Sequence, residues 1–260
     1  MRSNICVVMW FDDNIKSYAE INYIINKKYC DKYGYDIVKS SEKRTNIEPH
    51  WERVPLMIEQ LRNYTYVIWI DADAFFLKNS PPITNVIEKH SEKLFILSGD
   101  LNTRKECDIN SGFIIVKNSP ISFKILNQWY KNPDIRRIGN NIDTYHVLDQ
   151  GALRYIYDKN LFGLKDNSVV IQYGILQSFP TFQKERLTNI NAYGLTDRAF
   201  VAHLAGTDHS NRDIFSTNYL KHKFPGPCKC GFKKQTGKPA CCVLCHNNIG
   251  HGRLCTKTIE

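Results

Sequence analysis

The chain has 260 residues, of which 42% are hydrophobic and 12% aromatic, and this composition excludes a disordered protein. No stretch reaches the roughly 20 consecutive apolar residues that a membrane-spanning helix needs. The start of the chain also lacks the small-residue cleavage site of a signal peptide. The sequence therefore predicts a soluble protein, cytoplasmic or otherwise intracellular, without a membrane anchor.

The net charge of +9 is distributed unevenly along the chain. Residues 221–260 contain eight lysine and arginine residues against one acidic residue, whereas the first 220 residues contain 27 basic and 25 acidic ones. The body is therefore nearly neutral, which argues against a nucleic-acid-binding surface there. The basic C-terminal end is either a solvated tail or a segment that attracts an anionic partner.

The hydrophobic periodicity of the body alternates between strand and helix. In chain order, it predicts a strand at 4–11, a helix at 16–33, a strand at 35–39, a helix at 51–63, a strand at 66–70, a helix at 83–90, strands at 94–98 and 109–116, helices at 120–130 and 149–158, and short strands at 169–172 and 200–204. This order indicates an α/β fold with a central, mostly parallel sheet flanked by helices. The texture then changes to Pro, Gly, Lys and Cys, so we divide the chain into a domain at 1–222 and a basic, Cys/His-rich tail at 223–260.

The paired carboxylates Asp71 and Asp73 follow the apolar strand at 66–70 directly. Residues i and i+2 of an extended chain point to the same side, so the two carboxylates are expected to converge where the strand ends. They repel each other unless a cation lies between them, and a hard divalent cation that also meets substrate phosphates is the economical occupant. The alternative is one aspartate that caps a helix beside another that faces solvent.

Five short motifs follow one another along the chain: Trp51-Glu-Arg-Val-Pro, Trp69-Ile-Asp-Ala-Asp-Ala, Asn110-Ser-Gly-Phe, Asp149-Gln-Gly and His203-Leu-Ala-Gly. In this order they resemble the metal-dependent glycosyltransferases of the fold type called GT-A, which has a single Rossmann-like domain. The resemblance covers residues 4–210. It is greatest with the retaining galactosyl-, xylosyl- and mannosyltransferase family that includes the xyloglucan xylosyltransferases. It implies transfer of a hexose or pentose from a UDP- or GDP-sugar to a hydroxyl group of a glycan or glycoprotein.

The resemblance also implies a metal site and a catalytic locus. Asp71, Asp73 and His203 match the residues that hold Mn²⁺ or Mg²⁺ against the donor diphosphate, although His203 alone could also be a hydrogen-bonded core histidine. Asp149 and Gln150 match the segment near the anomeric carbon. There the carboxylate would act as a nucleophile, or the amide would stabilise an oxocarbenium-like state. A helix N-cap is the alternative for this pair.

Further positions match the donor-binding residues of the family. In addition to Asp71 and Asp73, they are Trp10, Phe11, Asp12, Arg53, Asn110, Ser111 and Gly206. Considered without the resemblance, Arg53 could equally form a salt bridge, and Asn110 with Ser111 could form only a polar turn into the next strand. Segments 136–143 and 174–186 are expected to be loops that set the acceptor.

The chain departs from the family pattern after the His-x-x-Gly motif. The family often has a basic residue there that meets the diphosphate, but this chain has Thr207, Asp208 and His209. Either Arg212 or Lys221 takes that place, or phosphate contact depends on the metal and the backbone alone. The departure concerns the affinity for the donor rather than the class of reaction.

The tail contains six of the nine cysteines of the chain. The candidate ligands of a zinc ion are Cys228, Cys230, Cys241, Cys242, Cys245 and His246. Zinc is favoured because the sequence predicts no signal peptide, but an even number of cysteines also fits disulfides in an oxidising compartment. The tail is expected to bind a partner through its basic residues.

Two other functions are compatible with parts of the sequence. A metal-dependent phosphohydrolase or nucleotidyltransferase would also use paired carboxylates, but no G-x-G-x-x-G or P-loop motif accompanies them. A nucleic-acid-binding zinc module on an inert carrier domain would have to bind through residues 221–260 alone.

Overall fold

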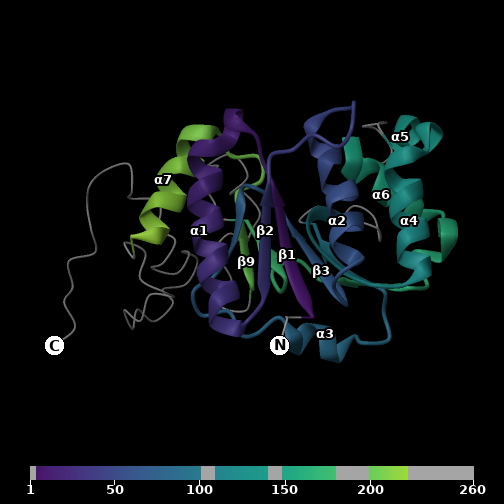
Figure 1. Cartoon of the computed structure of the whole chain (residues 1–260), viewed down its shortest axis with the longest axis horizontal. Coiled ribbons are helices and arrows are strands. Elements are labelled where there is room, and N and C mark those ends of the chain that lie inside the picture. The colour runs from purple at the N-terminus through teal and green to yellow at the C-terminus, as the bar shows by residue number, and fades with distance from the viewer. Residues whose placement is uncertain (1–3, 101–108, 140–147, 180–198, 222–260) are drawn as a thin grey trace, which may run out of the picture.

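A computed structural model describes residues 4–100, 109–139, 148–179 and 199–221 of the chain. These residues form two β-sheets between groups of helices (Figure 1). The tail, with its six cysteines and His246, lies outside the described residues, so the zinc site, the disulfide alternative and the domain boundary at 222 stay predictions. None of the helices within the described ranges is long and apolar enough to cross a membrane.

The larger sheet has six strands in the order β2-β1-β3-β6-β5-β7. Their bounds are Ile5–Trp10 (β1), Asp36–Ser40 (β2), Tyr66–Ile70 (β3), Phe95–Gly99 (β5), Ile109–Lys117 (β6) and Ser168–Ile171 (β7). The pairs β1–β2, β1–β3 and β5–β7 are parallel, and β6 is antiparallel to both of its neighbours. Five of the six strands therefore run in one direction, which confirms the prediction of a mostly parallel sheet.

The smaller sheet has three short strands in the order β4-β9-β8. They cover Ala74–Phe76 (β4), Gln177–Ser178 (β8) and Val201–His203 (β9). Strand β4 begins only four residues after β3 ends and pairs antiparallel with β9. The polypeptide therefore passes from the larger sheet to the smaller one through residues 71–73.

The helices cover both faces of the sheets, as Figure 1 shows. Helices α2 (Arg53–Leu61), α4 (Pro120–Lys131), α5 (Pro133–Gly139) and α6 (Leu148–Asp158) gather on one side, and α1 (Lys16–Tyr33) and α7 (His209–Leu220) lie side by side on the other. The remaining helices are α3 (Thr84–Lys89) and three short 3₁₀ helices, η1 (Asp13–Ile15), η2 (Pro49–Glu52) and η3 (Leu161–Gly163).

The central strands are buried on both faces, so their apolar residues alternate between two cores. In β3, Val67 and Trp69 belong to the core beneath α2 and α4, whereas Ile68 and Ile70 belong to the core on the other face. Because side chains alternate along the strand, this alternation determines toward which face of the sheet the side chains after β3 point.

The strands and helices expected from periodicity are present. Two strands, β4 and β8, and two α-helices, α5 and α7, were missed, as were the short 3₁₀ helices η1 and η3. Asn110 and Ser111 lie inside β6, as the predicted strand at 109–116 places them, so the alternative of a polar turn before the strand was wrong. The register between β5 and β6 shifts beside them and forms a bulge. The expectation that two further segments are loops was wrong in part. Segment 174–186 contains β8, and the first residues of segment 136–143 belong to α5.

Candidate functional site

The two aspartates lie in the turn that joins the two sheets. The Asp71 amide donates to the Gly112 carbonyl at 2.9 Å, which extends the pairing of β3 with β6. The Ala74 amide then donates to the Asp71 carbonyl at 2.9 Å and closes a four-residue turn. The Asp73 carbonyl accepts from the amide of Leu204, the residue after β9, at 2.8 Å. The carboxylates converge as the sequence predicted, but through this turn rather than through an extended strand.

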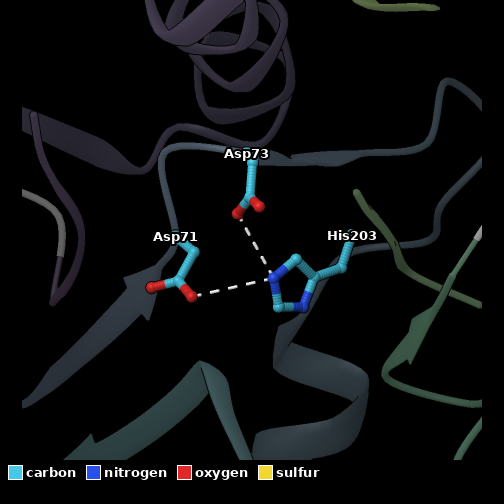
Figure 2. Close-up of side chains that lie close together, drawn as sticks. All are labelled: Asp71, Asp73 and His203. Carbon is cyan, nitrogen blue, oxygen red and sulfur yellow. Dashed lines mark ion pairs between the residues drawn. The ribbon is translucent and has the colours of Figure 1, made fainter. Parts of the chain in front are cut away.

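His203 ends β9 and completes a cluster with both carboxylates (Figure 2). Its Nε2 atom lies 3.2 Å from Asp73 Oδ1 and 3.7 Å from Asp71 Oδ2. Its Nδ1 atom lies 3.0 Å from Gln177 Oε1 on the neighbouring strand β8. The imidazole thus has one nitrogen in the carboxylate cluster and the other at a buried amide, and its role as a metal ligand stays a prediction.

Gly112 lets the imidazole approach the larger sheet. A Cβ atom at this position would lie 2.2 Å from His203 Cε1 and 2.7 Å from His203 Nδ1. Because real Cβ atoms do not approach so closely, only glycine fits here. The Gly112 amide donates to the Asn110 side chain at 2.9 Å, which fixes the local conformation of the bulge.

The two carboxylates differ in their surroundings and in their pKa values. Burial raises the pKa of Asp71, although Arg53 and His203 oppose this effect. Burial also disfavours the charge on Asp73, but His203 and Arg212 outweigh it and lower the pKa of Asp73 to about 2. For His203, burial alone would lower the pKa, but Asp73 and Asp71 raise it above the ordinary value. The cluster is therefore held together by ion pairing.

Arg53 connects this cluster to the catalytic locus predicted from the sequence. It begins α2 and is 7% exposed. Its Nη2 atom lies 3.1 Å from Asp71 Oδ1, and its Nε atom lies 3.1 Å from Asp149 Oδ2. Its Nη1 atom donates to the Ser111 carbonyl at 2.7 Å. The salt-bridge alternative for Arg53 is thus realised, and one guanidinium joins two carboxylates from distant parts of the chain.

Asp149 and Gln150 lie in the first turn of α6 and meet the bulge of β6. The Asp149 carboxylate accepts from Ser111 Oγ at 3.2 Å, and Gln150 Oε1 accepts from the Ser111 amide at 2.9 Å. Asp149 is 4% exposed, and its carbonyl accepts from the Trp129 indole at 2.9 Å. These partners give Asp149 a position in the Arg53 network rather than the role of a helix cap.

Arg212, one of the two basic residues considered for the diphosphate, reaches the cluster from α7. Its Nη2 atom lies 2.9 Å from Asp73 Oδ2, and its Nη1 atom donates to the Tyr18 hydroxyl at 3.0 Å. Lys221, the other residue considered, is exposed just after the end of α7. His209 packs edge-on against Tyr18 with ring centroids 5.5 Å apart.

A cavity of about 220 Å³ opens beside these residues. Its lining comes from both sides of the molecule: Trp10, Ile15, Tyr18, Pro49, His50, Arg53, Trp69, Asp71, Ala72, Asp73 and Arg212. Aromatic rings, two arginines and two carboxylates therefore surround one space. Such a mixture of apolar walls and a few convergent charges is typical of a small-molecule site.

The residues matched by resemblance do not all reach this cavity. Trp10 lines it, whereas Phe11 is buried in the core and Asp12 caps η1 by accepting from the Asn14 amide at 3.0 Å. Gly206 supplies a left-handed backbone conformation, with φ of 70°, just before α7. This backbone conformation is enough to explain why a glycine stands at position 206, and no contact with the nucleotide-sugar donor is needed for it.

Several residues of the site were given no role from the sequence, although two of them stand inside the motifs: Tyr18, His50, Trp69, Gly112 and Gln177. Trp69 carried a readable signal, because it stands two residues before Asp71 and shares its side of β3. Its indole donates to Asp71 Oδ1 at 2.7 Å, and the Arg53 guanidinium lies 5.1 Å from its ring centroid. Gln177 gave no such signal, because a two-residue strand has no detectable period.

The cluster of Asp71, Asp73 and His203 fits a divalent cation. One ligand atom from each residue lies within 4.8 Å of the others. Carboxylate oxygens and an imidazole nitrogen are ligands that suit manganese, and carboxylate oxygens suit magnesium. The other oxygens of the two aspartates are held by Trp69, Arg53 and Arg212, so the inward-facing atoms are the ones that remain for a cation.

Comparisons with known proteins agree with this geometry. Residues 6–192 match the model of a family described as nucleotide-diphospho-sugar transferase. A glycosyltransferase involved in the glycosylation of the major capsid of PBCV-1 has a similar structure, with a TM-score of 0.62, 17% identity, and coverage of 82% of this chain and 98% of that one. No curated protein matches the chain by sequence.

Two further solved structures share the fold. The galactosyltransferase LgtC, in complex with donor and acceptor sugar analogs, has a TM-score of 0.51 at 13% identity, with coverage of 84% of this chain and 95% of that one. The glycosyltransferase GlyE of Streptococcus pneumoniae TIGR4 has a TM-score of 0.52 at 13% identity, with coverage of 84% and 62%. At these identities the likeness establishes a GT-A-like α/β fold.

Proposed function

This chain belongs to the nucleotide-diphospho-sugar transferase family and is a glycosyltransferase, and we propose that it is a metal-dependent, retaining one. Its donor would be a UDP- or GDP-sugar, and its acceptor a hydroxyl group of a glycan or glycoprotein. The observation that carries the proposal is the convergence of Asp71, Asp73 and His203 at the edge of a cavity that also contains two arginines.

A divalent cation would be held by Asp71, Asp73 and His203. Mn²⁺ or Mg²⁺ would neutralise the negative charge that develops on the nucleoside diphosphate as it leaves. Neighbouring residues of the chain keep one of the two carboxylates charged and orient the other. The low pKa of Asp73 keeps its carboxylate charged at every physiological pH, with burial opposed by His203 and Arg212. Trp69 and Arg53 orient Asp71 from outside the cluster.

Arg212 is the residue that we assign to the donor diphosphate in place of the missing basic residue. It lines the cavity, and its guanidinium is already ordered by Asp73 and the Tyr18 hydroxyl. A planar guanidinium can form two parallel hydrogen bonds to phosphate oxygens, so it provides charge and orientation together. Lys221 is not required for this role.

Asp149 and Gln150 are our candidates for the catalytic locus of a retaining reaction. Arg53 holds the Asp149 carboxylate on one side and the metal-binding cluster on the other, so the distance between the two is fixed by one side chain. A fixed carboxylate near the anomeric carbon would act as the nucleophile or stabilise an oxocarbenium-like state electrostatically. Asn110 and Ser111 would support this locus through the bulge of β6.

The decisive test compares donor turnover by the wild type and by Asp71→Asn/Asp73→Asn. The wild type is incubated with Mn²⁺ and a panel of UDP- and GDP-sugars, and the released nucleotide is identified. We expect Mn²⁺-dependent release of one nucleoside diphosphate, reduced at least about 100-fold in the double variant. The matched control is Asp31→Asn/Asp134→Asn, which removes the same charge from two exposed surface pairs.

The outcomes separate the classes of enzyme. Release of a nucleoside monophosphate would favour the phosphohydrolase or nucleotidyltransferase alternative, because those reactions break a phosphorus–oxygen bond. No turnover and no Mn²⁺-dependent nucleotide binding across the panel would refute the proposal. The anomeric configuration of the transferred sugar, read by proton NMR, tests retention separately.

A further inference from the structure

Gln177 is a buried polar residue that none of the sequence motifs includes. It begins β8 and is only 1% exposed. Strand β8 runs parallel to β9, with Gln177 opposite Val201. Val201 and His203 are two residues apart on β9 and project to the same side, so the pairing brings Gln177 next to His203. The position is thus determined by the smaller sheet.

The partners of the Gln177 amide fix its orientation. Its Nε2 atom donates to the Gly99 carbonyl at 3.5 Å, and its Oε1 atom lies 3.0 Å from His203 Nδ1. A carbonyl oxygen can only accept, so the amide nitrogen must face Gly99 and the amide oxygen must face His203. Because that oxygen carries no hydrogen, the proton of the hydrogen bond has to reside on His203 Nδ1.

We propose that Gln177 is a positioning residue that keeps the proton on His203 Nδ1 and directs Nε2 toward Asp71 and Asp73 as a metal ligand. The inference rests on the proposed metal dependence. Histidines that bind metals generally donate their other ring N–H to a fixed acceptor, and this hydrogen bond sets both the tautomer and the ring orientation. Here the fixed acceptor is the side-chain oxygen of Gln177 in β8.

Two other neighbours restrain the imidazole but cannot choose its tautomer. The Phe179 ring packs edge-on, with centroids 5.3 Å apart and an interplanar angle of 74°. Gly112 provides close contact on the side of the larger sheet. Neither residue accepts a hydrogen bond from the ring in these contacts, so the acceptor function falls to Gln177. A purely packing role would be met by an apolar side chain at a lower desolvation cost.

The first experiment measures Mn²⁺ affinity in Gln177→Leu. Leucine is similar in size to glutamine but has no hydrogen-bond acceptor for His203 Nδ1. We expect the affinity for Mn²⁺, read from the free ion by electron paramagnetic resonance, to fall about 10- to 100-fold. The KM for Mn²⁺ in donor turnover should rise while kcat at saturating Mn²⁺ changes much less. The matched control is Gln172→Leu, the same substitution at an exposed position of the same segment, which should bind Mn²⁺ as the wild type does.

A second variant separates hydrogen bonding from packing. Gln177→Glu keeps an oxygen acceptor for His203 Nδ1 while it loses the donor to Gly99. We expect it to recover Mn²⁺ affinity to within about threefold of the wild type. Equal losses in the leucine and glutamate variants would overturn the inference, and so would wild-type affinity in Gln177→Leu.

A third measurement is made on the wild type, and a variant is used only to assign the signals. In ¹⁵N-histidine-labelled wild type, the His203 signals are assigned by their loss in His203→Gln, and long-range ¹H–¹⁵N spectra report the protonated nitrogen. We expect a slowly exchanging proton on Nδ1, both alone and with Mg²⁺ and UDP. An Nδ1 atom without a proton would refute the role of Gln177. If the wild type binds no divalent cation, the proposed function fails instead, so the two failures are distinguishable.

Discussion

The two sheets of this molecule contribute to the same site but are stabilised in different ways. The larger sheet has strands of up to nine residues, and its central strands are buried on both faces between two apolar cores. The smaller sheet has strands of only two or three residues. Strands of that length cannot bury enough apolar surface to be stable alone. The smaller sheet must therefore be held by its surroundings.

Helix α1 holds the smaller sheet through two buried asparagines. Asn26 donates to the Ala74 carbonyl at 3.1 Å and accepts from the Phe76 amide at 2.8 Å. One side chain thus pairs a carbonyl and an amide on the edge of β4 that faces α1. Asn22 donates to the Ala72 carbonyl at 2.9 Å in the preceding turn. The backbone of β4 is thus satisfied by side chains on one side and by β9 on the other.

The difference between the sheets explains the two halves of the candidate metal site. The larger sheet and the helices on it orient Asp71 through Trp69 and Arg53. The smaller sheet supplies His203 from β9, and α7 supplies Arg212 to Asp73. A change that separates the two sheets should therefore abolish the site without unfolding the larger core.

The largest effect is expected at Gly112, where the larger sheet touches His203. In Gly112→Ala the new Cβ atom would lie 2.2 Å from His203 Cε1, so the imidazole must leave its present position beside Asp71 and Asp73. A displacement of about 1 Å at a site of this kind can reduce activity about 100-fold. Donor turnover and Mn²⁺ binding should both fall by at least that factor, whereas circular dichroism should show the larger fold intact.

A glycine far from the site serves as the control. Gly34 ends α1 with φ of 71°, and within the described part of the chain no atom lies within 4 Å of a Cβ built there. Gly34→Ala should lower the free energy of unfolding by about 1 kcal/mol because of backbone strain, with turnover per folded molecule unchanged. Wild-type turnover in Gly112→Ala would mean that His203 is not restrained by the larger sheet.

The next effect concerns stability and distinguishes the two asparagines of α1. Asn26→Ala leaves the Phe76 amide and the Ala74 carbonyl without partners, which should lower the free energy of unfolding by about 2–4 kcal/mol. Asn22→Ala removes one hydrogen bond and also a buried Oδ1 atom that has no partner among the described residues, so about 1 kcal/mol is expected. Urea denaturation measures both. Equal losses would contradict the role given to Asn26.

The same contrast determines what the sequence could predict. The strands of the larger sheet contain long apolar runs, so their positions and the convergence of Asp71 with Asp73 were predictable. Strands β4 and β8 are too short for a period, and their stability comes from side chains such as Asn26 that are distant in the sequence. Helix α7 was missed although Asp208 caps it by accepting from the Asn211 amide at 2.8 Å. Contacts of this kind depend on the fold, so the contacts of Gln177 and Gly112 with His203 could not be found from spacing.

A smaller effect is expected at Trp69, which orients Asp71 from the larger sheet. Trp69→Phe keeps an aromatic ring beneath Arg53 but removes the indole donor, which lies 2.7 Å from Asp71 Oδ1. We expect the affinity for Mn²⁺ to fall about tenfold, since hydrogen bonds to charged groups contribute about 1.5–3 kcal/mol. The control is Trp51→Phe, a buried residue outside the cavity lining. An equal loss in both variants would show that ring volume, rather than the hydrogen bond, is responsible.

The smallest effect is a pH dependence that originates in the smaller sheet. Burial would lower the pKa of His203, but Asp73, Asp71 and, more weakly, Asp100 raise it above its ordinary value of about 6.5. A raised pKa in the folded state stabilises the metal-free protein fully below about pH 6.5, and this contribution is lost as the pH rises through the folded pKa. Melting temperatures from pH 6 to 9 should therefore fall more for the wild type than for His203→Gln.

Since Mn²⁺ and the proton compete for Nε2, the increase in melting temperature on adding Mn²⁺ should grow with pH. An increase that is independent of pH, or equal in His203→Gln, would remove His203 from the metal site and leave the carboxylates as its only protein ligands.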